Sequence, residues 1–282
     1  MVEFRPMADD DVEQILAMRE AAFGLPRLPE DAERSLDGEY HVIADGAEVL
    51  GVLRVYRWSQ WFGGNRVPTA GVASVTVAPK ARGRGTGRDL MARTLTLLRD
   101  EGVPLSTLYP STAAPYRRAG YELAGARVRY SLRVGDLPTH LSGDVDAWGD
   151  DDLDDVRACY DRFAAATNGM LDRSEGAWRN AVLAPSGDRS AFRYLVREDG
   201  EVTGYLVYSQ ETDSGRMPFR YVRGDTPYNY QLACRDLVTT TPEAGRRLLA
   251  FLAGHRAMAT NVLWTGPPND PLDVLFPALY GM

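Results

Sequence analysis

The stretch from Gly71 to Arg88, GVASVTVAPKARGRGTGR, most constrains what this chain can fold into. Its first part, Val72–Val77, is a run of small and β-branched residues, which is typical of a strand covered on both faces. Its second part carries alternating glycines at positions 83, 85 and 87. Apolar side chains at helical spacing follow and predict a helix over residues 86–101. The order strand, glycine-rich turn, helix predicts a mixed α/β fold in which the turn binds a phosphorylated ligand.

The chemistry of this turn follows from its place at a helix N-terminus. The first N–H groups of a helix have no partner within the helix and carry a partial positive charge. Phosphate oxygens satisfy both, and glycines without a Cβ let the main chain approach them closely. Arg82, Arg84 and Arg88 add charge-assisted donors. The same glycine pattern also occurs in turns that are only flexible, so the turn alone leaves that alternative open.

Two common nucleotide motifs do not match this turn. A Walker loop requires a lysine directly after its last glycine, and none follows here. A dinucleotide-binding fingerprint needs a third glycine or alanine where Arg88 stands. The phosphorylated ligand is therefore expected to be of another kind.

The composition narrows the function classes. At 282 residues the chain suits about two domains. A net charge of −7 argues against binding nucleic acid over a large surface, and no apolar run approaches the roughly 18 residues needed to cross a bilayer. The two cysteines and three scattered histidines fit neither a metal site nor a Ser-His-Asp triad. The N-terminal residues lack the layout of a signal peptide, so we expect a cytoplasmic protein without a metal, a nucleic-acid partner or a membrane partner.

Two halves of similar outline are expected. In the first half, strand and helix signals alternate up to a final strand at residues 127–134, with a short helix at residues 31–36. Glycine and proline in residues 137–149 indicate a boundary. The second half repeats hairpin, strand, helix and strand, but it has no second glycine-rich turn. We therefore expect one domain at residues 1–136 and a second at residues 145–282.

Residues 59–69 contain Trp61, Phe62 and two glycines, and they are predicted to form a loop between strands. Aromatic side chains there fit either a packed surface loop or the wall of a substrate pocket beside the next strand.

The segment Val77–Gly87, read as Val-Ala-Pro-x-x-Arg-Gly-x-Gly-x-Gly, resembles the acetyl-CoA-binding motif of the GNAT (Gcn5-related) N-acetyltransferases. Their pattern Arg/Gln-x-x-Gly-x-Gly/Ala is met by Arg82, Gly85 and Gly87. The aromatic stretch before it and the segment Tyr116–Tyr121 are similar to the Eis-type (enhanced intracellular survival) acetyltransferases of that superfamily. The resemblance extends over essentially the whole chain. It implies tandem GNAT-like domains, each a mixed central sheet flanked by helices, of which the second is degenerate and has no cofactor site.

The resemblance also implies roles for residues of this sequence. The backbone of Val75, Thr76 and Val77 would pair with the pantetheine arm of acetyl-CoA, as an added strand does. Tyr116 matches the family's general acid, which protonates the departing CoA thiolate. The alternatives are a Tyr116 ring that only packs, or Tyr121 as the acid, although Tyr121 is expected to begin a strand and to pack. The other cofactor contacts would come from the turn and from the residues after the next strand: Arg82, Gly83, Arg84, Gly85, Thr86, Gly87, Arg88, Ser111 and Thr112.

The activity implied by the resemblance is acetyl-CoA-dependent N-acetylation of a primary amine. Aminoglycosides or other polyamine-like cations are the implied acceptors, and a hexamer is the implied assembly. Protein-lysine acetylation and a non-catalytic acyl-CoA-binding or interaction module are the alternatives.

The general base is left open by the sequence. The family takes it from the C-terminal carboxylate of a third domain similar to sterol carrier proteins. Such a domain needs about 100 residues, and this sequence ends at Met282 without one. Either the sequence is part of a longer chain, or the base comes from elsewhere. The carboxylate of Met282, an acid such as Glu39 and a water chain are the candidates.

Overall fold

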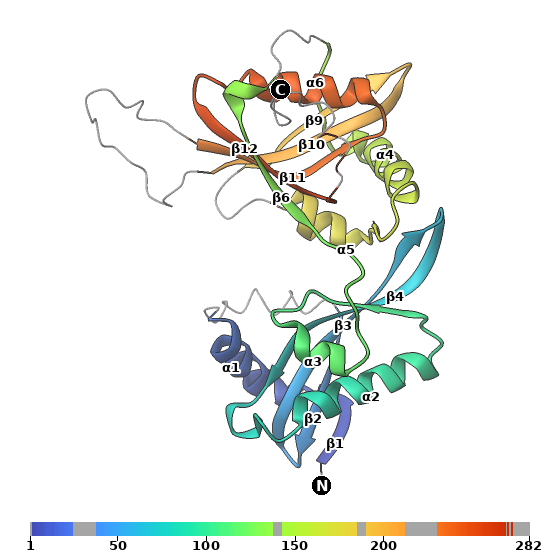
Figure 1. Ribbon diagram of the computed structural model, residues 1–282, viewed down its shortest axis with the longest axis vertical. Coiled ribbons are helices and arrows are strands. Elements are labelled where there is room, and N and C mark those ends of the chain that lie inside the picture. The colour runs from blue at the N-terminus through green and yellow to red at the C-terminus, as the bar shows by residue number, and fades with distance from the viewer. Residues whose placement is uncertain are drawn as a thin grey trace, which may run out of the picture. The chain divides into compact units, whose positions relative to one another are not determined.

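The structure is a computed structural model that describes residues 2–24, 38–137, 143–184, 190–211, 230–268, 270 and 272. The chain forms two compact units (Figure 1). The first comprises Met1–Ala124 with Gly169–Asp172, and the second comprises Gly125–Asn168 with Arg173–Met282. The helix expected at residues 31–36 and the chain end at Met282 lie outside the described residues.

The first unit is built on a six-stranded sheet in the order β1-β2-β3-β4-β5, with β8 pairing β3. All neighbouring strands are antiparallel except β4 and β5, which run parallel and are connected through α2. Parallel neighbours need such a crossover because a tight turn cannot join them. The elements of this unit are β1 (Val2–Pro6), η1 (Asp9–Asp11), α1 (Val12–Phe23), β2 (Glu39–Asp45), β3 (Glu48–Phe62), β4 (Asn65–Val77), η3 (Pro79–Ala81), α2 (Thr86–Asp100), β5 (Leu105–Thr107), α3 (Ala113–Arg118) and β8 (Leu171–Asp172).

Helices cover both faces of this sheet. Val52 of β3 packs in the cluster that contains Ile15 of α1, whereas its neighbour Leu53 packs in the cluster that contains Leu90 of α2. Successive side chains of a strand point to opposite faces, so both clusters need apolar residues in an unbroken run. The predicted fold class, a mixed α/β fold with central strands covered on both faces, is confirmed.

The second unit repeats this plan. Its six-stranded sheet has the order β6-β12-β11-β10-β9-β7, and its parallel pair, β11 and β12, is connected through α6. Leu248 and Leu252 of α6 are fully buried against this sheet. The elements of this unit are β6 (Val128–Arg133), η4 (Val134–Asp136), β7 (Asp146–Ala147), η5 (Asp150–Asp152), α4 (Leu153–Ala165), α5 (Glu175–Ala177), η6 (Trp178–Leu183), β9 (Phe192–Glu198), β10 (Glu201–Glu211), β11 (Tyr230–Thr239), α6 (Pro242–Ala253) and β12 (Ala259–Gly266).

The strand expected at residues 127–134 is present, but it belongs to the second sheet and not to the first. β6 pairs antiparallel with β12, and the Tyr130 ring stacks on Trp264 at a centroid distance of 4.8 Å. Leu132 and Val134 are buried in the core of the second unit. The physical reason is a long-range pairing across more than 120 residues, which local sequence patterns do not encode.

The loop expected at residues 59–69 is also corrected. β3 and β4 stay paired up to Phe62 opposite Asn65, so the aromatic stretch forms the tip of a long hairpin (Figure 1). Gly63 and Gly64 form its turn with φ of 56° and 76°. Two successive positive φ values suit the type I′ turn, whose twist matches that of the flanking strands.

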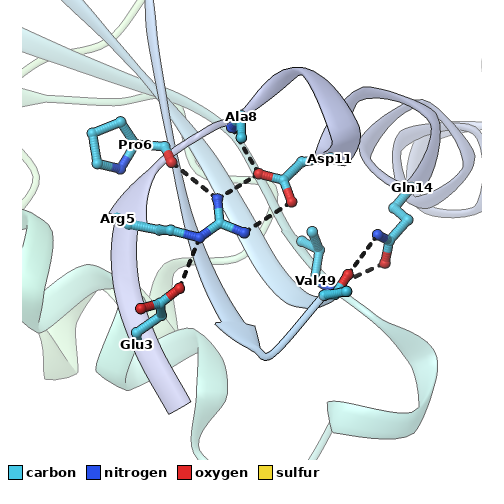
Figure 2. A network of polar contacts seen from close by, with 8 residues as sticks. Glu3, Arg5, Pro6, Ala8, Asp11, Gln14 and Val49 are labelled. Atoms are coloured by element: carbon cyan, nitrogen blue, oxygen red, sulfur yellow. Dashed lines mark hydrogen bonds and ion pairs between the residues drawn. The ribbon is translucent and has the colours of Figure 1, made fainter. Parts of the chain in front are cut away.

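A buried ion pair joins β1 to the start of α1 (Figure 2). Arg5 donates two hydrogen bonds to Asp11, of 2.5 and 3.0 Å, and Asp11 also accepts the backbone N–H of Ala8 at 2.8 Å. Asp11 is only 3% exposed. The hydrogen bonds from Arg5 hold the pKa of this carboxyl below its usual value. Figure 2 also shows Gln14 of α1 bound to the backbone at Val49, so two polar contacts fix α1 to the sheet.

We expect Asp11→Ala to lower the free energy of unfolding by about 3 kcal/mol, because it leaves a partly buried guanidinium without its carboxylate. The exposed neighbour Asp10 makes a matched control, and Asp10→Ala is expected to change stability little. Since the pKa of Asp11 is lowered by folding, its contribution is present above the unfolded-state pKa and is lost as the pH falls through the folded-state pKa. Chemical denaturation at pH 7 and at pH 3 measures this; an equal effect at both values would contradict the ion-pair explanation.

Candidate active site

The free edge of β4 is the centre of the candidate site. β4 pairs with β5 only at Thr69–Gly71 and then continues to Val77 along its other edge with β3 alone. Among the described residues no strand pairs with the β5-facing edge of β4 beyond Gly71. An unpaired edge is a template for an added extended chain. Val75, Thr76 and Val77, singled out from the sequence, all lie on this segment.

A β-bulge interrupts β4 in the middle of that segment. Arg54 pairs with Ala73 and Val52 with Thr76, so Leu53 stands opposite two residues, Ser74 and Val75. Ser74 has a φ of 52°, and the Thr76 hydroxyl donates to its carbonyl at 3.1 Å. A left-handed conformation costs a residue with a side chain of the order of 1 kcal/mol, and such strain concentrates at functional sites. The bulge turns a backbone amide out of the ladder, and nothing in the sequence marks it, because serine carries no signal for a positive φ.

The glycine-rich turn connects this edge to α2. η3 ends at Ala81, and Gly85 takes a φ of 86° as the N-cap of α2, where no side chain caps the helix. The first intrahelical bond runs from Asp89 N–H to the carbonyl of Gly85 at 3.0 Å. The amides of the first three helical residues, 86–88, therefore have no acceptor within the helix. This is an anion-binding geometry, which the sequence predicted from its spacing.

The basic residues of the turn are open to solvent. Arg82, Arg84 and Arg88 are exposed, and no ion pair to any of them is found in the described part of the chain. Arg82 donates through Nε to the carbonyl of Val77 at 3.3 Å, which holds it next to the end of β4. Like the helix amides, these guanidinium groups are accessible to an anion.

Close packing places α2 against the strands. A Cβ on Gly87 would lie 3.4 Å from a methyl group of Val77, and a Cβ on Gly51 of β3 would lie 3.2 Å from the methyl group of Thr86. Gly51 is a residue that sequence reasoning missed, because one glycine in a strand has no pattern around it. Its lack of a side chain lets the start of α2 approach β3.

Tyr116 lies on α3 and packs in the same apolar cluster as Val75 of β4. Its side chain is half-buried, and this burial raises the pKa of its phenol. The hydroxyl makes no hydrogen bond with any described residue, so it is available to a ligand. At neutral pH the phenol is therefore a protonated donor that packs against the same cluster as the bulged segment of β4.

The rival Tyr121 is engaged elsewhere. Its hydroxyl lies 2.6 Å from Ser106 Oγ, and its ring meets that of Tyr116 edge to face at 6.3 Å. Tyr121 packs as expected, but it does not begin a strand, because residues 121–127 have no ladder partner before β6. Its polar end is satisfied within the fold, which favours Tyr116 as the free donor.

The remaining sequence-derived residues lie near α3 and β2. Ser111 and Thr112 are exposed directly before α3, and Thr112 is its N-cap without a side-chain hydrogen bond. Glu39, a candidate for the base, is ion-paired with Arg57 at 2.9 Å. Met282 lies outside the described residues. Among the described residues, no group of three or more His, Cys, Asp or Glu gathers as metal ligands, and none of the helices is long and apolar enough to cross a membrane.

Comparison with models of protein families identifies the family of this chain. Residues 3–124 match a model described as an acetyltransferase (GNAT) domain, and residues 169–279 match a second model with the same description. The chain belongs to the GNAT acetyltransferase family. The predicted tandem of GNAT domains is thereby confirmed, and the free edge, bulge and turn described above lie in the first GNAT match.

Relatives agree with this family. An uncharacterized N-acetyltransferase of Streptomyces coelicolor is 36% identical over 159 residues, covering 52% of this chain and 38% of its own length. The N-acetyltransferase Eis of Mycobacterium tuberculosis is 29% identical over 187 residues, covering 59% of this chain and 45% of its own length. The chain thus spans about half, or less, of these two relatives. The crystal structure of a GCN5-related N-acetyltransferase from Anabaena variabilis superimposes with a TM-score of 0.86 at 26% identity, covering 98% of this chain and 69% of that one.

The second GNAT match lacks an open helix N-terminus at the equivalent place. α6 follows β11 as α2 follows β4, but the Thr241 hydroxyl accepts the N–H of Ala244 at 3.1 Å and Pro242 stands at the first helical position. Proline has no N–H, and the threonine side chain satisfies another amide. The helix end that could hold a phosphate is therefore occupied by its own cap.

We expect Gly85→Glu to raise the dissociation constant of acetyl-CoA at least about 100-fold, since a like charge placed against a phosphate costs several kcal/mol. Gly46 in the β2–β3 turn also has a positive φ, 60°, and open space around it. Gly46→Glu therefore carries the same charge and a similar backbone penalty away from the site, and it should bind acetyl-CoA normally. Titration calorimetry of both variants tests the turn; equal affinities would contradict its assignment.

Proposed function

We propose that this protein transfers the acetyl group of acetyl-CoA to a primary amine, and that its first unit holds the cofactor. The observation that supports this most strongly is the continuity of three features. A free strand edge carries a bulge, it leads into an uncapped helix N-terminus, and a protonated tyrosine packs in one cluster with the bulged segment.

The backbone of Val75, Thr76 and Val77 would pair with the pantetheine arm, because these residues lie where the second edge of β4 has no partner among the described strands. The turn Arg82–Arg88 would hold the pyrophosphate with helix amides and arginine side chains. Ser111 and Thr112 would lie toward the acetyl end. The capped start of α6 supports the further proposal that the second unit binds no cofactor there.

Bound acetyl-CoA would supply a thioester, whose C–S bond breaks as the amine nitrogen forms a bond to the acetyl carbon. Tyr116 would donate its phenolic proton to the departing sulfur, which requires a phenol that is protonated at the working pH. The raised pKa of Tyr116 meets this requirement. The amide exposed by the bulge at Ser74 is the candidate donor to the carbonyl oxygen. The proton lost by the amine passes to water or to a carboxylate that acts as the base.

The acceptor and the assembly are further parts of the proposal. The resemblance to Eis-type enzymes suggests aminoglycosides or other polyamine-like amines as acceptors, a homohexamer, and a cytoplasmic location. Initial rates of thiol release with an aminoglycoside panel, a polyamine panel and lysine peptides would separate these acceptors. Light scattering gives the assembly directly.

We expect Tyr116→Phe to lower kcat by roughly 100- to 10,000-fold, the range over which a positioned general acid contributes. The affinity for acetyl-CoA should stay nearly unchanged, because the phenol is not expected to hold the cofactor. Tyr121→Phe removes a hydroxyl from the neighbouring ring and serves as the matched control, with a small effect on kcat. Thiol release and equilibrium binding are the two measurements.

The outcomes distinguish the alternatives. Equal kcat for wild type and Tyr116→Phe would rule out Tyr116 as the acid. Tight acetyl-CoA binding by the wild type without thiol release for any amine would instead support a non-catalytic acyl-CoA-binding module.

A further inference from the structure

A row of stacked side chains runs along β3 on the face of the sheet that α1 covers. The Arg54 guanidinium lies 4.2 Å from the centre of the Tyr56 ring, and Tyr56 stacks on Trp58 at 4.9 Å with an interplanar angle of 8°. Tyr40 of β2 pairs directly with Arg54, and its ring centre is 5.4 Å from the same guanidinium. Tyr40 packs in the α1 cluster, which places the row on that face.

This row lies beside the reacting segment of β4. Ala73 pairs with Arg54 and immediately precedes the bulge at Ser74, and Gly71 pairs with Tyr56. A Cβ on Gly71 would collide with the Trp58 indole, so glycine there lets that ring lie across β4. Paired strands are about 5 Å apart, so Arg54 is one strand away from the backbone proposed to meet the acetyl group.

Arg54 is a buried charge without a hydrogen-bonding or ionic partner among the described residues. It is 6% exposed, its Nε is fully buried, and no hydrogen bond or ion pair to its guanidinium is found there. The Tyr40 hydroxyl and the Trp58 indole N–H are buried on the same face and also lack a hydrogen bond. A guanidinium carries five N–H donors and a permanent positive charge, so leaving it unpaired inside a protein is costly.

Two other arginines, Arg5 and Arg173, are paired with carboxylates and stabilise the fold. Arg5 makes two hydrogen bonds to Asp11 (Figure 2). In the second unit, Arg173 makes two to Asp236, of 2.5 and 2.9 Å, while its guanidinium lies over the Tyr160 ring at 3.7 Å. Like Arg173, Arg54 lies over aromatic rings, but no carboxylate pairs with it among the described residues. Buried groups that lack a partner need an explanation, and ligand recognition is a common one.

We propose that Arg54 binds a carboxylate carried by the acceptor, so that the acceptor is an amine with an anionic group and not a polycation. This inference rests on the proposed acetyl transfer to a primary amine, and it replaces the polyamine-like acceptors suggested by the resemblance with amines that carry a carboxylate. A carboxylate satisfies the guanidinium fork through two parallel hydrogen bonds, and the Tyr40 hydroxyl and the Trp58 indole N–H are two further donors on this face. The same buried charge repels a polyamine, which makes it a specificity determinant as well.

Matched acceptor pairs test this inference through thiol release. L-Phenylalanine and L-phenylalaninamide differ in the carboxylate, as do 4-aminobutyrate and 4-aminobutanamide, and their rates are compared at equal concentrations of free amine because amidation also lowers the basicity of the amine. The diamine 1,4-diaminobutane represents a polycation. We expect kcat/KM to favour the carboxylate member of at least one pair tenfold or more. Arg54→Met should abolish that preference mainly through KM, and Arg54→Lys should retain part of it. The exposed Arg99 gives a control, Arg99→Gln, which should behave as wild type.

Two results would overturn the inference. One is a wild type that accepts the amides and the diamine as well as the acids. The other is an Arg54→Met variant that slows all acceptors equally while losing thermal stability, which would make Arg54 a structural residue. If Arg54→Met fails to fold, Arg54→Lys takes its place as the test. A reduced preference for the carboxylate acceptor in Arg54→Lys would support the inference, and an unchanged preference would contradict it.

A binding measurement separates this inference from the proposed function. 3-Phenylpropionate has a carboxylate and no amine, so it binds without being acetylated. Titration by NMR should show tighter binding to wild type and Arg99→Gln than to Arg54→Met. Binding that depends on Arg54 without any amine turnover would support the anion site and contradict the acetyltransferase proposal. Amine turnover without any binding or preference that depends on Arg54 would support the acetyltransferase proposal and contradict the anion site.

Discussion

The divergence of β4 from β5 is the constraint on which the rest of the site depends. The two strands are parallel neighbours at Thr69–Gly71 and separate beyond it, so the end of β4 keeps one edge open. Parallel strands require a crossover, and here the crossover is α2, whose N-terminus begins directly after the open edge. One topological choice therefore supplies both the extended backbone and the helix amides that a long phosphorylated cofactor needs.

The two units show how small local changes alter such a site. Both have a parallel pair joined by a crossover helix, and both have a register shift in the strand before that helix. In the first unit the helix starts after a glycine that provides no side-chain cap, whereas in the second the Thr241 hydroxyl accepts the N–H of Ala244 and Pro242 has no N–H to offer. Satisfying those amides internally stabilises the helix, and leaving them open makes them available to an anion.

The arginine side chains likewise divide into those that are paired within the fold and those that are not. Arg5 and Arg173 are each paired with a carboxylate and tie elements together, whereas the arginines of the turn are solvent-exposed and Arg54 is buried among aromatic rings. A positive charge at the exposed turn would favour the phosphates of the proposed cofactor. The buried positive charge of Arg54, on the strand next to β4, would select acceptor molecules by their charge.

The sequence by itself determined the local features: the helix start at Gly85, the arginines around it, the apolar central strand and the short helix of Tyr116. Each depends on neighbours within a few residues, and together they also indicated the family. Tertiary structure alone decided the pairing of β6 with β12, the bulge at Ser74 and the lack of a carboxylate partner for Arg54 within the described part of the chain. These arise from contacts between distant segments, and no spacing along the chain records which buried charge finds a partner and which does not.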